Sequence, residues 1–513
     1  MDHGTTFQLR FTDDITEIGR RSLTPMPPGT GTIRIVPGKG AVDLAGLPSY
    51  QNDACFAILS TEFHSRKNCD VQLAAAADWW FDCYVNGELV YSTMDLGNGG
   101  APDAKRHHFP AHLKEGENRI VFVVERGADS MKFYFDLQPL PANADAVKCR
   151  IPVQLERELR PPQPEFPLLF PPLITHMTPR TMLIRAITTV PVKLGAEACF
   201  PNGERFTVFG DGGCRTVHTL KLDHPAKRIE GTFRLFTCNG GKRTDLAEDY
   251  PVHSFGETGP LRFLAFGDTQ HSMLYRFDLL KKYAELAERA NVDFVVHLGD
   301  IDSFSDNYES RYLRGFLEPY ARLFHGRPLM PVFGNHELRG KEPRRWFDQF
   351  AIAPGETCYT FRGSEIFFAV LDGGDEDPKI EQLIPHQQQI LKAAFSTPEF
   401  QNAKYRIVLI HGVNVEPFPT GSKMKAVLEP FHNGADFDLV IAGHVHRYAL
   451  YPRGQYPFPI VTLDGPGGVR ESSALLIQFD GDSLSACALT PDGEEFDRFT
   501  IMNRKQKPIA TNY

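Results

Sequence analysis

The sequence predicts a multidomain protein in which two all-β domains precede an α/β domain. Its 513 residues exceed a single hydrophobic core, because one domain usually holds roughly 100–200 residues. Aromatic and β-branched runs separated by turn residues fill the first half of the chain, whereas from Leu261 onward short apolar runs alternate with helical spacing. We therefore expect domains at residues 1–152, 153–258 and 259–513.

The first predicted domain carries a strong β-hairpin signal. The aromatic run Trp79–Val85 is separated by Asn86-Gly87 from a second β-prone run, Glu88–Tyr91. An Asn-Gly pair favours a two-residue hairpin turn, because both turn residues need positive φ. A second turn, at residues 113–118, leads into the apolar run Arg119–Val124. These features resemble the galactose-binding-like jelly-roll modules, a resemblance that implies an all-β module of that kind.

The second predicted domain begins after a proline-rich linker. Residues 154–172 contain six prolines, which exclude a sustained helix and favour a stiff, extended segment. Short β-prone runs follow at Met182–Ile187, Phe206–Phe209 and Gly231–Thr237. Their spacing predicts a small fibronectin- or immunoglobulin-like sandwich.

The third predicted domain alternates strands and helices. Apolar residues at helical spacing predict a helix over Met273–Ala290, and shorter helices over Gln387–Phe395 and Met424–Phe431. Five apolar runs predict buried strands: Leu261–Phe266, Phe294–Leu298, Leu329–Phe333, Tyr405–Ile410 and Leu439–Ala442. From Pro459 onward the pattern is again typical of β structure.

A short polar cluster follows each of these five strands. The clusters are Gly267-Asp268-Thr269-Gln270, Gly299-Asp300-Ile301-Asp302, Gly334-Asn335-His336-Glu337, His411-Gly412 and Gly443-His444-Val445-His446. In open α/β sheets, sites form at the edge where strands end. One cluster alone is weak support for a site, but five in succession predict that these side chains meet.

The residue types in the clusters are those of a two-metal phosphoester-hydrolysing site. Two cations about 3.5–4 Å apart can neutralise phosphate oxygens and lower the pKa of a bound water. Asp300 lies centrally among the clusters and is predicted to bridge the two metals. We expect Asp268 and His446 to bind the first metal, and Asn335, His411 and His444 to bind the second. His444 and His446 are two residues apart, so in an extended segment both imidazoles point the same way.

Each cluster also has a plainer interpretation. Asp268 and Asp300 could cap helices, Asn335-His336 could be a simple turn, and His411 could be a hydrogen-bonded structural histidine. Two histidines next to a glycine after Leu-Val-Ile-Ala, by contrast, have no packing rationale. The succession of all five clusters therefore favours the metal site.

The succession resembles the motifs of the calcineurin-like metallophosphoesterase superfamily, which run DxH, GDxx(D/N), GNH(E/D), a lone His and GHxH. The resemblance extends from Leu261 to the end of the chain. It implies a four-layer (αββα) metallophosphoesterase sandwich with metals at the strand ends. It also implies that His336 stabilises charge or donates a proton near the leaving oxygen. The β-sandwich ahead of this domain and the GHVHRY context are similar to the purple acid phosphatase branch.

Two positions depart from the family pattern. Gln270 stands where the family usually has histidine, so we expect an amide ligand there, which is a poorer donor for soft metals. Ser303 stands where the purple enzymes have a metal-binding tyrosine. A purple ferric–tyrosinate centre is therefore not expected.

We predict a metal-dependent phosphoester hydrolase, with a phosphatase favoured over a phosphodiesterase. Hydroxide held between two divalent or trivalent ions (Mn, Fe or Zn) would attack phosphorus, with Asp300, Asn335 and His336 as catalytic residues. The substrate would be a phosphorylated small molecule, glycan or protein. The alternative, motivated by Gln270, is a weakly active or inactive scaffold that binds a glycan or protein through its β modules.

Composition limits the other possibilities. The formal charge of −9 argues against nucleic-acid binding by bulk electrostatics. No apolar run reaches the roughly 18 residues of a membrane span. Nine unpatterned cysteines and the lack of a visible signal peptide favour a cytoplasmic protein. A secreted or periplasmic location would follow if a leader had been removed. The oligomeric state is left open.

Overall fold

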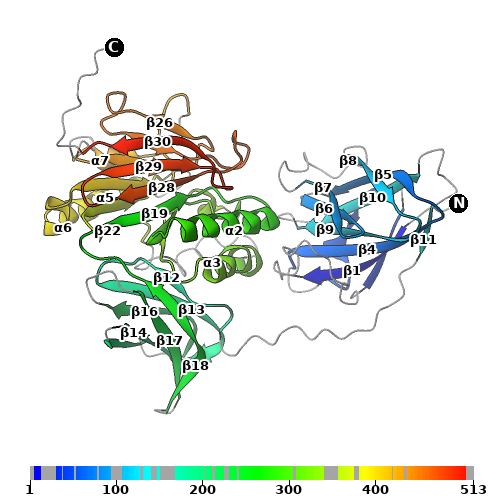
Figure 1. Cartoon of the computed structure of the whole chain (residues 1–513), viewed down its shortest axis with the longest axis horizontal. Coiled ribbons are helices and arrows are strands. Elements are labelled where there is room, and N and C mark those ends of the chain that lie inside the picture. Colours follow the sequence, from blue (N-terminus) through cyan, green and yellow to red (C-terminus); the bar gives the residue numbers. More distant parts are fainter. Residues whose placement is uncertain are drawn as a thin grey trace. The chain divides into compact units, whose positions relative to one another are not determined.

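The computed structural model describes residues 5–503 with internal gaps. The gaps are 13–30, 37–38, 51–53, 78–79, 94–106, 127–130, 140–146, 151–167, 202, 211–213, 225–229, 240–241, 304–307, 340–349, 351–355, 375–379, 419 and 432–435. The chain divides into two compact units (Figure 1). Unit 1 contains Met1–Pro162, His271–Asp278 and Asp306–Phe316, and unit 2 contains Gln163–Gln270, Leu279–Ser305 and Leu317–Tyr513.

Unit 1 is built on two antiparallel sheets. The first has the order β2 (Gly31–Ile35), β1 (Thr5–Thr12), β4 (Phe56–Ser65), β9 (Gly116–Glu125), β6 (Trp80–Val85) and β7 (Glu88–Ser92), with β11 (Val147–Arg150) also paired to β4. The second has the order β3 (Val42–Asp43), β10 (Lys132–Pro139), β5 (Cys69–Ala77) and β8 (His107–Leu113). Phe7, Phe122 and Phe135 interlock between them with ring centroids 5.1–6.1 Å apart. The predicted hairpin is confirmed, since β6 pairs with β7 across Asn86 (φ 52°) and Gly87 (φ 87°).

Unit 2 contains a long mixed sheet, here called sheet I. Its order is β16 (Arg215–Asp223), β13 (Thr181–Val192), β12 (Leu173–Thr175), β21 (Leu329–Pro331), β20 (Phe294–His297), β19 (Leu261–Phe266), β28 (Ala474–Phe479), β29 (Leu484–Leu489) and β30 (Glu495–Ile501). β19, β20 and β21 run parallel to one another, so their carboxyl ends share one edge.

The region predicted as a second β-sandwich contributes to sheet I. Thr175 of β12 lies opposite Leu329 of β21 in a parallel pair. A separate sheet from the same region has the order β15 (Arg205–Phe209), β14 (Leu194–Cys199), β17 (Glu230–Asn239) and β18 (Lys242–His253). The boundaries at residues 152 and 258 stay predictions, and most of the proline-rich linker lies outside the described residues.

A further sheet of unit 2, sheet II, faces sheet I. Its order is β22 (Tyr359–Gly363), β23 (Ile366–Leu371), β24 (Tyr405–Ile410), β25 (Leu439–Ala442), β27 (Ile460–Thr462) and β26 (Ala449–Tyr451). The two sheets share one apolar core, in which Phe263 and Phe294 of sheet I pack against Phe368 of sheet II. β23, β24 and β25 are parallel, so their carboxyl ends also share an edge.

Helices cover the outer faces of both sheets (Figure 1). On sheet I, α2 (Met273–Arg289) packs Tyr283 against Phe266 of β19, and Phe324 at the end of α3 (Glu318–Leu323) stacks on the same ring. The π-helix η3 (Tyr308–Leu317) precedes α3. On sheet II, a second apolar core joins β23 and β24 to α5 (Ile380–Phe395), α6 (Pro398–Gln401) and α7 (Met424–Leu428). The described part of unit 2 therefore confirms the four-layer αββα architecture.

The main difference from the predicted elements is α5. It begins at Ile380 rather than at Gln387, and Pro385 lies inside it. Proline removes a backbone donor and disfavours the helix interior, which is why the sequence pattern predicted a later start. Within the described residues, no helix has the length and hydropathy needed to cross a bilayer.

His176, which follows β12, is a buried titratable group with an unusual environment. Its side chain is 6% exposed, and its ring packs edge-on against Tyr359 with centroids 4.7 Å apart. Neither ring nitrogen has a hydrogen-bond partner among the described residues. Burial, followed by the positive charge of Arg185, holds the pKa of His176 well below its ordinary value.

We expect His176 to weaken the fold at mildly acidic pH. The unfolded chain takes up a proton near pH 6.5 whereas the folded chain does not, so the free energy of unfolding falls as pH drops below that value. One pH unit lower, the loss is about 1.4 kcal/mol. Denaturant unfolding of wild-type and His176→Phe chains at about pH 7.5 and about pH 5.5 measures the difference. Identical pH dependence in both chains would contradict this assignment.

Candidate metal centre

The structure brings the side chains that were predicted as ligands to the shared edge of sheets I and II. They are Asp268 and Gln270 after β19, Asp300 after β20, Asn335 after β21, His411 after β24, and His444 and His446 after β25. Parallel pairing within each sheet places these strand ends side by side. The geometry therefore satisfies the condition for a common site, while the role of each residue as a ligand stays a prediction.

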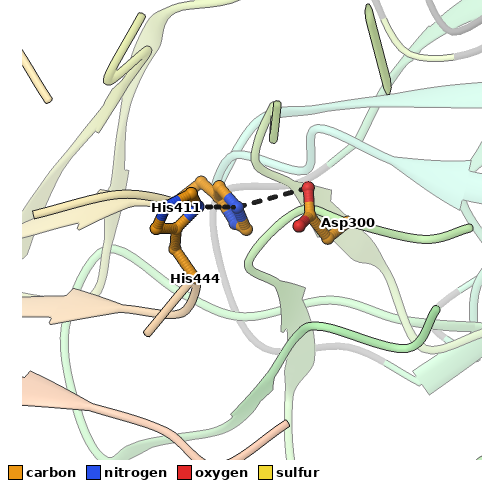
Figure 2. Close-up of side chains that lie close together, drawn as sticks. All are labelled: Asp300, His411 and His444. Carbon is orange, nitrogen blue, oxygen red and sulfur yellow. Dashed lines mark hydrogen bonds and ion pairs between the residues drawn. The ribbon is translucent and has the colours of Figure 1, made fainter. Parts of the chain in front are cut away.

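One group of donor atoms surrounds His411 (Figure 2). Its Nε2 lies 3.0 Å from Asn335 Oδ1, 3.2 Å from Asp300 Oδ1 and 3.0 Å from His444 Nδ1. His444 Nδ1 is also 3.0 Å from Asn335 Oδ1. The other ring nitrogen of His411 donates to the carbonyl of Leu298 at 2.8 Å, so a neutral ring presents its lone pair to the group. Several lone pairs then converge, and a cation would satisfy them together.

A second group of donor atoms surrounds His446. Its Nε2 lies 3.3 Å from Asp268 Oδ1 and 3.2 Å from Gln270 Nε2, which itself lies 3.1 Å from Asp300 Oδ2. His446 Nδ1 donates to the carbonyl of Pro466 at 2.7 Å, so here too the neutral ring turns a lone pair to the group. Asp268, Asp300 and His446 offer ligand atoms within 4.8 Å of one another.

Gln270 gives an independent test of whether a metal fits. Its Oε1 is buried and has no hydrogen-bond partner among the described residues. The two ends of a glutamine amide have nearly the same shape, and exchanging them is a matter of assignment. Exchange would turn the oxygen toward Asp300 Oδ2 and His446 Nε2, where a cation would satisfy it. Side chains of the kinds that bind cations therefore lie on each side of Asp300.

The backbone at the site adopts an uncommon conformation. Asp268, Asp300, His444 and His446 have φ values of 51°, 57°, 68° and 51°, in the left-handed region that costs most residues energy. This conformation lets the backbone N–H of His444 donate to both oxygens of Asp268, at 2.9 and 3.0 Å. A Cβ on Gly443 would collide with Asp268 Oδ2, so glycine is required there. Strain of this kind clusters at functional sites.

Burial and close charges strongly shift the pKa values in the group around His411. Burial alone would raise the pKa of Asp300, but the imidazole of His411 outweighs it, and the pKa lies well below its usual range. Burial would likewise lower the pKa of His411, yet the Asp300 carboxylate raises it to about 10. Burial and then the positive charge of His411 lower the pKa of His444 to about 4. Without a cation, His411 thus carries a proton at neutral pH. A bound metal would displace this proton.

His336 lies beside this centre. Its backbone N–H donates to Asp300 Oδ1 at 3.0 Å, and its Nδ1 donates to the carbonyl of Ser303 at 2.8 Å. The Nε2 atom lies 3.7 Å from Asp300 Oδ2 and accepts a hydrogen bond from Arg339 Nη1 at 2.8 Å. Ser303, at the position of the tyrosine of the purple enzymes, therefore orients His336 through its backbone.

Glu337 is the residue that sequence reasoning missed. Its carboxylate accepts backbone hydrogen bonds from Asp300 N at 3.0 Å, Ile301 N at 2.8 Å and Gly334 N at 2.8 Å. Burial and then the charge of Asp300 raise the pKa of Glu337 to about 7. It ties the turn after β20 to the turn after β21, and so positions Asp300 and Asn335. Its position next to Asn335 and His336 in the Gly-Asn-His-Glu cluster is the feature of the sequence that could have indicated this role.

Comparisons with known proteins concern the domain that carries the site. The family model for calcineurin-like phosphoesterase matches residues 261–448. Purple acid phosphatase 21 of Arabidopsis thaliana is 24% identical over 290 residues, covering 52% of this chain and 62% of that protein, less than two thirds of its length. The structure of purple acid phosphatase PPD1 from yellow lupin (Lupinus luteus) seeds aligns with a TM-score of 0.51 at 14% identity. That alignment covers 87% of this chain and 92% of the lupin chain, and it shows a shared fold. Residues 261–448 of this chain therefore form a domain of the calcineurin-like phosphoesterase family, and purple acid phosphatases are among its relatives.

Proposed function

We propose that the chain is a metal-dependent phosphoester hydrolase with a dinuclear centre, and that it acts on phosphate monoesters in preference to diesters. The observation that carries the proposal is the position of Asp300. One carboxylate oxygen lies against the group around His411, and the other lies against Gln270 in the group around His446. A carboxylate shared in this way is what a bridged metal pair requires.

Each side of Asp300 would hold one cation. Asp268, Gln270 and His446 would complete one set of ligands, and Asn335, His411 and His444 would complete the other. When bound, two such ions would neutralise phosphate oxygens and lower the pKa of a water molecule between them. Oxygen and imidazole ligands suit manganese, iron or zinc, and Ser303 supplies no tyrosinate for a purple centre.

The chain itself contributes to binding and to charge stabilisation. The Nε2 edge of His336 faces Asp300, and Arg339 places a guanidinium 2.8 Å from that nitrogen. A guanidinium in this position can pair with phosphate oxygens. His336 would then stabilise the charge that develops on the leaving oxygen, or donate a proton to it. The natural substrate is proposed to be a phosphorylated small molecule, glycan or protein.

Metal removal tests the proposal. We expect a chelator to lower hydrolysis of an aryl phosphate monoester at least about a hundredfold, and added Mn²⁺, Zn²⁺ or iron to restore it. Elemental analysis of the protein restored with Mn²⁺, a metal that thiolate ligands do not favour, should find about two manganese ions per chain. A parallel assay on an aryl diester tests the monoester preference.

Two results would overturn metal-dependent hydrolysis, and a third would overturn the monoester preference. Equal hydrolysis by the stripped and the loaded protein would exclude metal-dependent catalysis. No bound metal and no turnover after metal-rich growth would instead support the alternative, an inactive scaffold that binds through its β modules. Faster diester hydrolysis would keep the metal centre but reverse the substrate preference.

A further inference from the structure

A second group of ligand-type side chains lies in unit 2 and shares no residue with the centre described above. It consists of Glu356, Cys358 and His386. Cys358 Sγ donates to Glu356 Oε1 at 3.0 Å, and His386 Nε2 donates to Glu356 Oε2 at 2.8 Å. Each residue offers one ligand atom, and these atoms lie within 4.8 Å of one another.

The topology of sheet II explains how these residues meet. Glu356 and Cys358 directly precede β22, whose first residue, Tyr359, lies opposite Val370 near the end of β23. Helix α5 carries His386 and covers the same sheet. Cys358 is therefore at the edge of sheet II that also carries His411, two strand spacings or about 10 Å along it.

The chemistry of the three side chains is that of a zinc site. Thiolate, imidazole and carboxylate are the usual protein ligands of Zn²⁺, at about 2.0–2.3 Å from the ion, which places ligand atoms about 3.3–3.8 Å from each other. The observed separations of 2.8 and 3.0 Å are slightly shorter, as expected where protons rather than a cation join the atoms. A small outward movement of exposed His386 would accommodate the ion.

The burial of the group also fits a cation site. Cys358 is buried, the side chain of Glu356 is 19% exposed and that of His386 is 48% exposed. An ion can therefore approach from the His386 side, while the thiol is held inside. Burial and then the hydrogen bond to Glu356 raise the pKa of the Cys358 thiol. In the metal-free protein the thiol therefore keeps its proton, and binding of Zn²⁺ to the thiolate would release it.

We propose that Glu356, Cys358 and His386 form a mononuclear site for a soft divalent cation such as Zn²⁺. The bound ion would fasten the start of β22 to helix α5, with a fourth position open to water. This site is separate from the proposed dinuclear centre in its ligands and in its use of sulfur.

The use of sulfur allows a direct test. Metal-stripped full-length protein is titrated with Co²⁺, and absorption from thiolate-to-cobalt charge transfer is recorded in the near ultraviolet. We expect the absorption band to appear as Co²⁺ binds and to disappear when Zn²⁺ is added and replaces the cobalt. The dinuclear centre is predicted to use only oxygen and nitrogen ligands, so it contributes no such band. Asp300→Asn should therefore leave the band unchanged even if it abolishes hydrolysis.

Variants identify the ligands. Cys358→Ser and His386→Gln should each remove the band and lower zinc content by about one ion per chain. Cys214→Ser, at an exposed cysteine, is the matched control and should keep both. His386 is exposed, so its substitution tests the site even if Cys358→Ser does not fold. No band in the wild-type protein, or an undiminished band in the folded His386→Gln and Cys358→Ser proteins, would overturn the proposal.

Discussion

Asp300→Asn is expected to lower kcat/KM for an aryl phosphate by at least about a thousandfold. Both carboxylate oxygens of Asp300 are engaged, Oδ1 with His411 and Oδ2 with Gln270. An asparagine keeps one oxygen and replaces the other with an amide nitrogen, which has no lone pair for a metal. It also removes the negative charge that two adjacent cations require. We therefore expect loss of at least one bound metal together with the loss of turnover.

The fold should survive this substitution. The backbone N–H of Asp300 donates to Glu337 and its carbonyl accepts from Thr269 at 2.9 Å, and neither contact needs the side chain. Asparagine also tolerates the left-handed φ of 57° at this position. Elemental analysis measures the bound metal, steady-state kinetics measure kcat/KM, and far-ultraviolet circular dichroism measures whether the fold is kept. Asp492→Asn, which removes an exposed carboxylate paired with Lys282, is the control and should retain activity and metal.

One outcome would refute the bridging role. If Asp300→Asn restored with Mn²⁺ kept two manganese ions per chain and more than about a tenth of the wild-type kcat/KM, the shared carboxylate would not hold the pair. Loss of one metal with partial activity would place Asp300 in a single ligand set.

Sequence alone could predict the strands that carry the site. β19, β24 and β25 begin and end at the residues that their apolar runs indicated, because a buried parallel strand is a nearly continuous apolar segment. Polar residues directly after such strands must lie at the sheet edge. The convergence of Asp268 and Asp300 follows from that rule and from the parallel pairing of β19 with β20. His446 follows a strand of sheet II and meets them because the two sheets pack on one core.

Features that depend on distant pairing could not be predicted in this way. The parallel contact of Thr175 with Leu329 joins residues far apart in the chain, and no local pattern encodes it. The group of Glu356, Cys358 and His386 likewise needs β22 and α5 to meet first. The role of Glu337 depends on the distance between two turns, since its partners are backbone N–H groups rather than recognisable side chains.

Glu337→Ala is expected to lower the free energy of unfolding by about 3–5 kcal/mol, because it leaves three buried N–H groups without acceptors at about 1–3 kcal/mol each. Those groups belong to Asp300, Ile301 and Gly334. Relief of the repulsion between Glu337 and Asp300 offsets part of this cost. We also expect kcat/KM to fall about 10- to 100-fold, since the turns that present Asp300 and Asn335 lose their common support.

Glu337→Gln distinguishes positioning from simple packing. The glutamine oxygen can still accept from Asp300 and Gly334, which share Oε2 of the native residue, while its NH₂ group faces the donor of Ile301. Glu337→Gln should therefore lower the free energy of unfolding by less than Glu337→Ala does, by about 1–3 kcal/mol. Denaturant unfolding and steady-state kinetics of both variants test whether Gln loses less stability than Ala. Glu494→Gln, at an exposed carboxylate, is the control. Both variants remove the charge, but only Gln keeps the side-chain volume and an acceptor oxygen. A loss of activity as large for Gln as for Ala, despite a smaller loss of stability, would therefore mean that the charge of Glu337 acts on the reaction. Unfolding of the Ala variant at the wild-type denaturant concentration would mean that the three N–H groups find other acceptors, and that the two turns are held together by something other than this carboxylate.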